Sequence, residues 1–157
     1  MTKVEVKSPR VIQISDDRIP ELTALIDKWR DAMPAVDQEA LAASPQTALA
    51  VLDGETIVGG YILLHVPMAN EIAAMAVNPE CRLQGLGRLM CMDALFRSGK
   101  RPLVLTVNDT SLPFARAVGF KLVGKRRQPD GSFLTRLGWH APRPSEEPKS
   151  GASHATE

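Results

Sequence analysis

The sequence predicts an α/β fold, with a mixed sheet of about seven strands flanked by about four helices. Short β-rich runs alternate with segments of helical spacing along most of the 157 residues. The dipeptide Asp53-Gly54 separates two β-rich runs, which is a strong hairpin signal. A Gly-Leu-Gly loop at 85–87 joins an apolar strand to an apolar helix. The predicted order of elements is β-α-α-β-β-β-α-β-α-β-β.

The N-terminal half is expected to form the hairpin side of the sheet. A first strand is predicted over Arg10–Ile14. Apolar residues then recur at helical spacing over Ile19–Trp29, and Ser15-Asp16-Asp17 are expected to cap that helix. A second short helix is predicted over Val36–Ala43. The pair Gly59-Gly60 indicates a bulge or a close backbone approach. The next three strands are expected at Thr47–Leu52, Thr56–Val66 and Glu71–Val77.

The C-terminal half continues the alternation. Eight of the eleven residues of Leu86–Phe96 are apolar, so this helix is expected to be buried on most sides. A further helix is predicted to end at Val118, with Asn108 to Ser111 as its cap. The remaining strands are expected at Pro102–Val107, Phe120–Lys125 and Ser132–Leu137. Residues 1–140 are expected to form one domain, and 141–157 a tail that is disordered by composition.

Composition and charge exclude several classes of function. The net charge of +1 argues against general nucleic-acid binding, which needs a basic face. Cys81 and Cys91 lie ten residues apart with no histidine beside them, so we expect reduced thiols and no metal. The N-terminus lacks the apolar core of a signal peptide, and no apolar run reaches the ~20 residues of a membrane span. A soluble, cytoplasmic protein without a membrane partner is therefore expected.

The loop RLQGLGRLM, residues 82–90, is the clearest candidate binding site. It follows a strand and opens a helix, so unpaired N–H groups and the helix dipole favour an anion there. Gly85 and Gly87 allow close approach to the main chain, and Arg82 and Arg88 add positive charge. The dinucleotide fingerprint needs a third glycine where Met90 stands, and the P-loop sequence is absent. A tight turn without a ligand, or a seat for some other anion, remains an alternative.

Two motifs resemble those of the GNAT superfamily of acetyl-CoA-dependent N-acetyltransferases. VNPECRLQGLG, residues 77–87, is similar to the family hallmark Q/R-x-x-G-x-G/A after a strand that ends in Val-x-Pro. A second hallmark runs from Asn108 to Gly119-Phe120, eleven residues on. The resemblance covers residues 10–138. It implies the GNAT fold, in which strands 71–77 and 102–107 splay apart, and transfer of acetyl from acetyl-CoA to an amine acceptor, with a homodimer as one possible assembly.

The resemblance also implies which residues hold the coenzyme. Met75, Ala76 and Val77 would offer main-chain groups to the pantetheine arm, and Asn108 would lie beside the arm near the thioester. The residues implied to cradle the pyrophosphate are Arg82, Leu83, Gln84, Gly85, Leu86, Gly87 and Arg88.

Acetylation of a lysine-like amine, whose pKa is about 10.4, needs a base to remove a proton. Glu71 resembles the general base of the histone-acetylating branch in its position before the motif. The apolar IAAMAV that follows is expected to desolvate it partly. The alternative is an ordinary strand-end carboxylate in water. The acceptor is expected to enter opposite the coenzyme, between segments 31–45 and 126–132.

The tyrosine that many family members use as general acid is replaced here by Ala115. The only tyrosine, Tyr61, is predicted to lie on another strand. Water or Ser111 would then protonate the departing thiolate, which leaves tolerably well unaided because a thiol has a pKa of about 8.5. Ala115 also favours the alternative function, a CoA-binding regulatory or interaction module without turnover.

Overall fold

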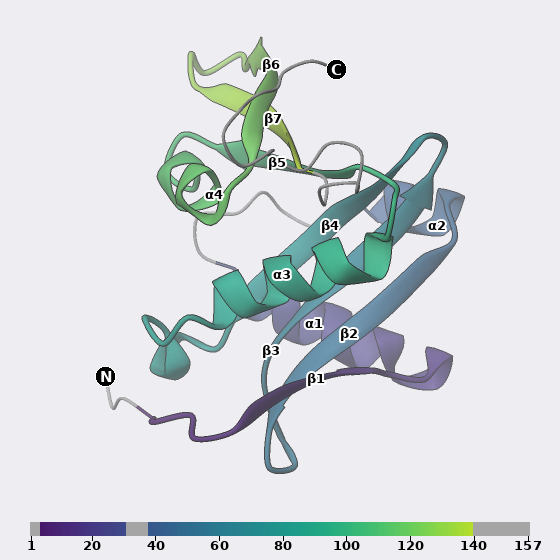
Figure 1. Cartoon of the computed structure of the whole chain (residues 1–157), viewed down its shortest axis with the longest axis vertical. Coiled ribbons are helices and arrows are strands. Elements are labelled where there is room, and N and C mark those ends of the chain that lie inside the picture. The colour runs from purple at the N-terminus through teal and green to yellow at the C-terminus, as the bar shows by residue number, and fades with distance from the viewer. Residues whose placement is uncertain (1–3, 31–37, 140–157) are drawn as a thin grey trace, which may run out of the picture.

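The computed structural model describes residues 4–30 and 38–139. Its strands form one seven-stranded sheet of order β1-β2-β3-β4-β5-β7-β6 (Figure 1). The strands are β1 Pro9–Gln13, β2 Gln46–Asp53, β3 Thr56–Val66, β4 Ala69–Val77, β5 Leu103–Asn108, β6 Lys121–Arg127 and β7 Phe133–Trp139. The helices are α1 Ile19–Trp29, α2 Gln38–Ala43, α3 Leu86–Ser98 and α4 Leu112–Val118, with 3-10 turns at Asp16–Arg18 and Pro79–Cys81. The predicted element order is confirmed. The tail 141–157 and the first two residues predicted for the second helix lie outside the described residues.

The sheet is split between β4 and β5. These strands run parallel and pair only from Asn70 with Leu103 to Ile72 with Leu105. On its other side, β4 carries a bulge, because Ile62 pairs with Ala74 while Leu63 pairs with Ile72, which leaves Ala73 without a partner in β3. The expected splaying of strands 71–77 and 102–107 is therefore confirmed, and it begins after Ile72.

Each face of the sheet has its own core. Leu86 and Met90 of α3 pack with residues from most strands in one cluster, and Leu22 and Ile26 of α1 pack in the other. Figure 1 shows α3 in front of the central strands and α1 behind them. Side chains of β4 divide accordingly: Ile72 and Met75 belong to the α3 cluster, and Ala74 and Ala76 to the α1 cluster. Since successive strand residues alternate in direction, Glu71 lies on the α1 face.

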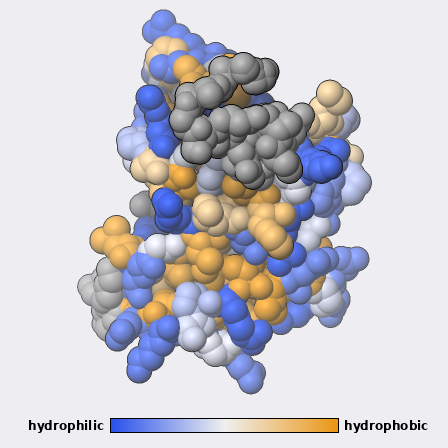
Figure 2. Space-filling model, viewed as in Figure 1, coloured by the Kyte–Doolittle hydropathy of each residue, from blue (hydrophilic) through white to orange (hydrophobic). Residues whose placement is uncertain are grey.

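Helix α3 is not buried on most sides, so that expectation is wrong. Met90 and Cys91 are fully buried against the sheet, whereas Met92 is 43% exposed and Phe96 is 85% exposed. Figure 2 shows apolar residues at the surface in the middle of this face, where α3 lies. The apolar residues are spread around the helix, but only one side of it can contact a sheet. The number of apolar residues predicted burial on most sides, but their distribution around the helix leaves Met92 and Phe96 exposed to solvent.

Two local expectations need correction. Ser15 was expected to cap the first helix, but its hydroxyl donates to the Asp17 carboxylate at 2.5 Å and a 3-10 turn precedes α1. The hairpin between β2 and β3 is present, yet its turn residues are Gly54 and Glu55, and Asp53 pairs with Thr56. Gly54 has a φ of +67°, so glycine is suited to the first turn position.

The pair Gly59-Gly60 confirms both the expected bulge and the close approach. The β2–β3 register shifts next to Gly59, which pairs with Val51. A Cβ atom at Gly60 would lie 2.6 Å from Cδ1 of Leu22 in α1 and 3.1 Å from the Leu49 carbonyl oxygen. The missing side chain lets α1 pack directly on the sheet.

Gly60→Ala is therefore expected to lower the free energy of unfolding by about 1–3 kcal/mol, because the added methyl overpacks the contact with Leu22. Gly124→Ala is a matched control in β6, since a Cβ there meets nothing within 4 Å. The control should stay within ~0.5 kcal/mol of the wild type. Chemical denaturation measures both variants. Equal stability of the two would contradict the close packing of α1.

Candidate functional site

A cleft of about 500 Å³ opens where β4 has parted from β5. Six of the residues predicted to hold a coenzyme border it, namely Met75, Ala76, Val77, Arg82, Leu83 and Gly87. Its other lining residues are Trp29, Met90, Thr110, Ser111 and Phe114. The end of α1, the end of β4, the start of α3 and the start of α4 thus meet at one place.

A second hollow of about 260 Å³ continues this cleft to the N-terminus of α3. The two share Val77, Arg82, Leu83, Gly87 and Phe114, and the second adds Cys81, Gly85, Leu86 and Arg88. The main-chain N–H of Leu89 donates to the Gly85 carbonyl oxygen at 2.9 Å. The N–H groups before it have no acceptor within the helix, and they carry the positive end of its dipole. One groove therefore runs from the parted strands to the N-terminus of α3.

The two glycines of this loop are required for different reasons. Gly85 has a φ of +81°, a left-handed conformation that side chains disfavour, although a Cβ there would meet nothing within 4 Å. At Gly87 a Cβ would lie 3.0 Å from Cζ of Phe114. Gly85 turns the chain into the helix, and Gly87 lets the ring from α4 close against α3.

The Arg82 side chain is partly engaged by the protein itself. Its Nη2 donates to the Trp29 carbonyl oxygen at 2.5 Å, and its Nε donates to the Val77 carbonyl oxygen at 3.4 Å. The guanidinium therefore ties the last turn of α1 to the end of β4. It also lines both parts of the groove, so its charge stays at the wall.

Gln84 and Leu83 have opposite environments. The Gln84 carboxamide donates to the Val4 carbonyl oxygen at 2.6 Å and accepts from the Val6 N–H at 2.8 Å. Its side chain thus holds the N-terminal segment, which leaves only its main chain for the loop. Leu83 is 94% exposed with a φ of +64°, so an apolar side chain stands in water at the rim of the groove. A bulky residue with positive φ is uncommon and often marks a functional site.

Asn108 shapes the turn before α4. Its carboxamide oxygen accepts a hydrogen bond from the Ser111 N–H at 3.0 Å. Thr110 and Ser111 border the cleft, whereas Asn108 does not appear among its described lining residues. Ser111 is only 8% exposed. In the sequence, Thr110 and Ser111 lie between the motif asparagine and a predicted helix. That position indicated a helix cap, but it did not indicate that the two residues border a cleft.

Glu71 lies beside Arg136 of β7. The carboxylate oxygen Oε2 is 3.8 Å from Nη1 of Arg136, and the Glu71 side chain is 26% exposed. Partial removal from water is thus as expected. The arginine was not anticipated, because 65 residues separate the two and only the insertion of β7 next to β5 brings them together. Glu71 is also the third residue of β4 instead of the first.

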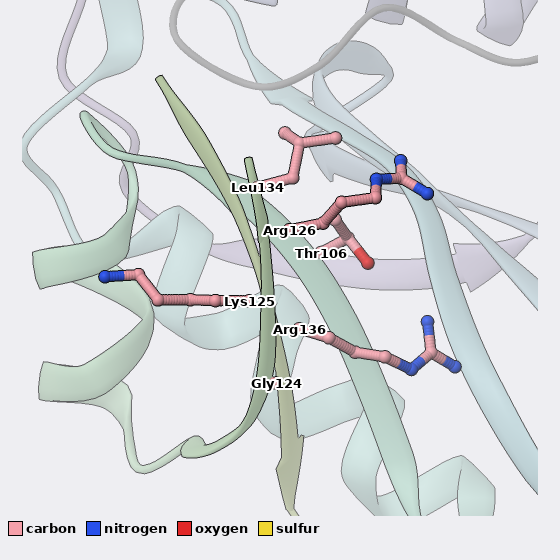
Figure 3. A pocket seen from close by; sticks show the side chains of 6 residues that line it. All are labelled: Thr106, Gly124, Lys125, Arg126, Leu134 and Arg136. Carbon is pink, nitrogen blue, oxygen red and sulfur yellow. The ribbon is translucent and has the colours of Figure 1, made fainter. Parts of the chain in front are cut away.

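A separate cavity of about 360 Å³ adjoins this ion pair. Figure 3 shows Arg126 and Arg136 extending to the same side of the β6–β7 hairpin. Lys125 extends to the opposite side, and its Nζ lies 4.5 Å from the centre of the Phe133 ring. Thr106, Gly124 and Leu134 complete the lining. Among the described lining residues, Arg126 and Arg136 thus supply the charged groups on this side of the hairpin.

The position of the usual catalytic tyrosine contributes no acid. Ala115 is fully buried in the core. Tyr61 is also buried and lies in β3, where its hydroxyl donates to Oδ2 of Asp93 at 2.7 Å. Burial, together with that hydrogen bond, raises the pKa of Tyr61 well above its usual value. Among the described residues that border the cleft, the hydroxyl groups are those of Thr110 and Ser111.

Cys81 and Cys91 are free and buried, which confirms the expected thiols. Burial raises the pKa of Cys91 to about 12 and also raises that of Cys81. Since the thiolate is the reactive form, neither should react quickly with Ellman's reagent in the folded protein. We expect two reactive thiols per chain only after unfolding in guanidinium. Fast release of thionitrobenzoate from the native protein would contradict this burial.

No group of three or more metal-binding side chains occurs within residues 4–30 and 38–139. Over the same residues, no helix is long and apolar enough to cross a membrane.

Comparison with known proteins identifies relatives of this arrangement. The family model described as Acetyltransferase (GNAT) family matches residues 11–120. An acetyltransferase from Bacillus subtilis in complex with CoA shares 18% identity at a TM-score of 0.63, over 85% of this chain and 99% of that one. A GNAT family acetyltransferase from Elizabethkingia anophelis with acetyl-CoA bound shares 15% identity at a TM-score of 0.65, over 85% and 98%.

The ribosomal-protein-S18-alanine N-acetyltransferase from Escherichia coli is similar to the same degree. It shares 17% identity at a TM-score of 0.65, over 83% of this chain and 92% of that one. At these identities the likeness shows the fold, and the GNAT fold predicted from the motifs is confirmed. The comparison with curated proteins gave no match.

Proposed function

The chain belongs to the acetyltransferase (GNAT) family, and from this premise we propose that it transfers acetyl from acetyl-CoA to an amine acceptor. The reaction is direct attack of the amine in a ternary complex. The observation that carries the proposal is the continuous groove from the N-terminus of α3 to the parted strands. Such a groove suits an elongated ligand with a diphosphate at one end and a thioester at the other.

The diphosphate is assigned to the helix end. The main-chain N–H groups of Leu86, Gly87 and Arg88 would donate to its oxygens, supported by the helix dipole. Gly85 and Gly87 keep the main chain accessible, and the Arg82 guanidinium at the wall adds charge. The remaining loop residues contribute main-chain groups, since the Gln84 side chain is already bound to the N-terminal segment.

The pantetheine arm is assigned to the edge of β4. After Ile72 this strand no longer pairs with β5, so the main-chain groups of Met75, Ala76 and Val77 can bind an extended ligand as a neighbouring strand would. The freed N–H groups of the same edge would polarise the thioester carbonyl as a small oxyanion site. Asn108 supports the facing wall by fixing the turn that carries Thr110 and Ser111.

Glu71 is proposed as the general base. It lies on β4 just before the strands part, so an amine that reaches the split from the α1 face would meet its carboxylate. The carboxylate would take a proton from the ammonium group, directly or through water. The thiolate that departs would be protonated by water or by Ser111.

A thiol-release assay over a panel of amines tests the proposal. Amino acids, amino sugars, polyamines and peptides would be offered with acetyl-CoA, and free CoA detected with Ellman's reagent. The buried Cys81 and Cys91 should give little background in the folded protein. We expect release with at least one class of amine. Tight binding of acetyl-CoA by calorimetry, without release from any amine, would contradict acetyl transfer.

A further inference from the structure

The cavity between Thr106 and Arg136 lies on the α1 face of the sheet, away from α3 and α4. Thr106 pairs with Arg136 across β5 and β7. Their neighbours Leu105, Val107 and Leu137 all belong to the core cluster beneath α3 and α4. Because side chains alternate along a strand, Thr106 and Arg136 point to the other face. This cavity therefore differs from the groove assigned to the coenzyme, and their described lining residues do not overlap.

The cavity nevertheless meets the same split in the sheet. Thr106 is the first residue of β5 beyond the last pair with β4, which joins Ile72 to Leu105. Arg136 lies within 3.8 Å of the proposed base Glu71. A molecule bound here would reach the parted strands from the side opposite the coenzyme. Under the proposed function, on which this inference rests, an acceptor would occupy this position.

The charge of the cavity is set by Arg126 and Arg136, whose side chains extend to the same side (Figure 3). Arg136 has Glu71 as a partner, but 44% of its side chain is exposed and at 3.8 Å the contact is loose. Among the described residues, Arg126 forms no ion pair. Lys125, which also lines the cavity, directs its ammonium group to the other side. Arg126 therefore gives the cavity a positive charge that no ion pair with a described residue neutralises.

We propose that the acceptor is a small amine that also carries an anionic group, a carboxylate or a phosphate, bound by Arg126 and Arg136. A guanidinium matches both groups because its N–H donors can bind two oxygens at once. A volume of about 360 Å³ suits a small metabolite or the end of a chain. Polyamines and other polycations are disfavoured, since two guanidinium groups would repel them. With Arg136 holding the anion, Glu71 remains next to the amine.

The test uses pairs of acceptors in which one member carries the anion and the other lacks it. Glycine is compared with glycinamide, and glucosamine 6-phosphate with glucosamine, in the thiol-release assay at fixed acetyl-CoA. We expect kcat/KM to be at least about tenfold higher for the anionic member of one pair, since a hydrogen bond to a charged group contributes that much. Which pair shows the preference identifies the anion as a carboxylate or a phosphate.

Arg126→Gln should raise KM for the anionic acceptor about tenfold and leave the neutral acceptor unchanged. Arg126→Lys keeps the charge but loses the two-oxygen geometry, so its effect should be intermediate. Arg127→Gln is the matched control, because the next residue of β6 points to the other face and does not line the cavity. Unchanged binding of acetyl-CoA to each variant shows that the fold and the coenzyme groove are intact.

Three results would overturn the inference. Equal rates for both members of each pair, or a polyamine as the best acceptor, would refute an anion-binding acceptor site while acetyl transfer stands. Thiol release from no amine of the wider panel would overturn acetyl transfer and this inference together.

Discussion

Glu71→Gln is expected to lower kcat by about 10²–10⁴ at neutral pH, which is the usual contribution of a general base. The carboxamide has nearly the same shape as the carboxylate but cannot accept the proton of the ammonium group. Binding of acetyl-CoA should be unchanged, because the groove assigned to it lies beyond Ile72. Steady-state kinetics with the best acceptor of the panel measures the loss.

The pH dependence of the variant separates a base from a structural role. As the pH rises toward about 10.4, more of a lysine-like amine is already neutral and needs no base. The loss in kcat should therefore shrink with rising pH, whereas loss from a displaced Arg136 would persist. Glu55→Gln, at the exposed tip of the β2–β3 hairpin, is the matched control and should behave as the wild type. Full activity of Glu71→Gln at neutral pH would refute the assignment.

Gly85→Ala is expected to weaken acetyl-CoA binding about ten- to hundredfold. A loss of this size corresponds to one charge-assisted hydrogen bond to the diphosphate. Alanine is strained at a φ of +81°, by about 1–2 kcal/mol. Relief of that strain would turn the first N–H groups of α3 away from the groove. Calorimetry with acetyl-CoA measures the change.

Gly99→Ala is a matched control for Gly85→Ala. Gly99 caps the other end of α3, has a φ of +62°, and likewise has open space where a Cβ would lie. Alanine there should also lower stability, yet Gly99 does not line the groove. Equal effects of the two substitutions on the dissociation constant would show that the loss of acetyl-CoA affinity comes from a less stable α3 and not from altered hydrogen bonds to the diphosphate.

The order of the elements along the chain was predictable from local signals. The hairpin glycine Gly54, the glycine loop at 82–88 and the asparagine at the end of β5 each mark a boundary between two elements. The splay of β4 and β5 came from the resemblance carried by two of these motifs. The prediction that α3 is buried on most sides was wrong, because the composition gives the number of apolar residues but not their positions around the helix.

The side-chain roles within the site were not predictable in the same way. Arg82 bonds to Trp29, which is 53 residues away, and Gln84 bonds to Val4 and Val6, which are about 80 away. Arg136 reaches Glu71 only because β7 inserts beside β5. Such contacts depend on strand order and on the path of the N-terminal segment, which no local spacing encodes.

The location of the coenzyme is the claim on which the rest depends, and a crystal structure with acetyl-CoA bound tests it most directly. The diphosphate should accept hydrogen bonds from the main chain of residues 85–88, with the acetyl group at the split between β4 and β5 near Glu71. A diphosphate bound at Arg126 and Arg136, or anywhere other than the N-terminus of α3, would contradict the account.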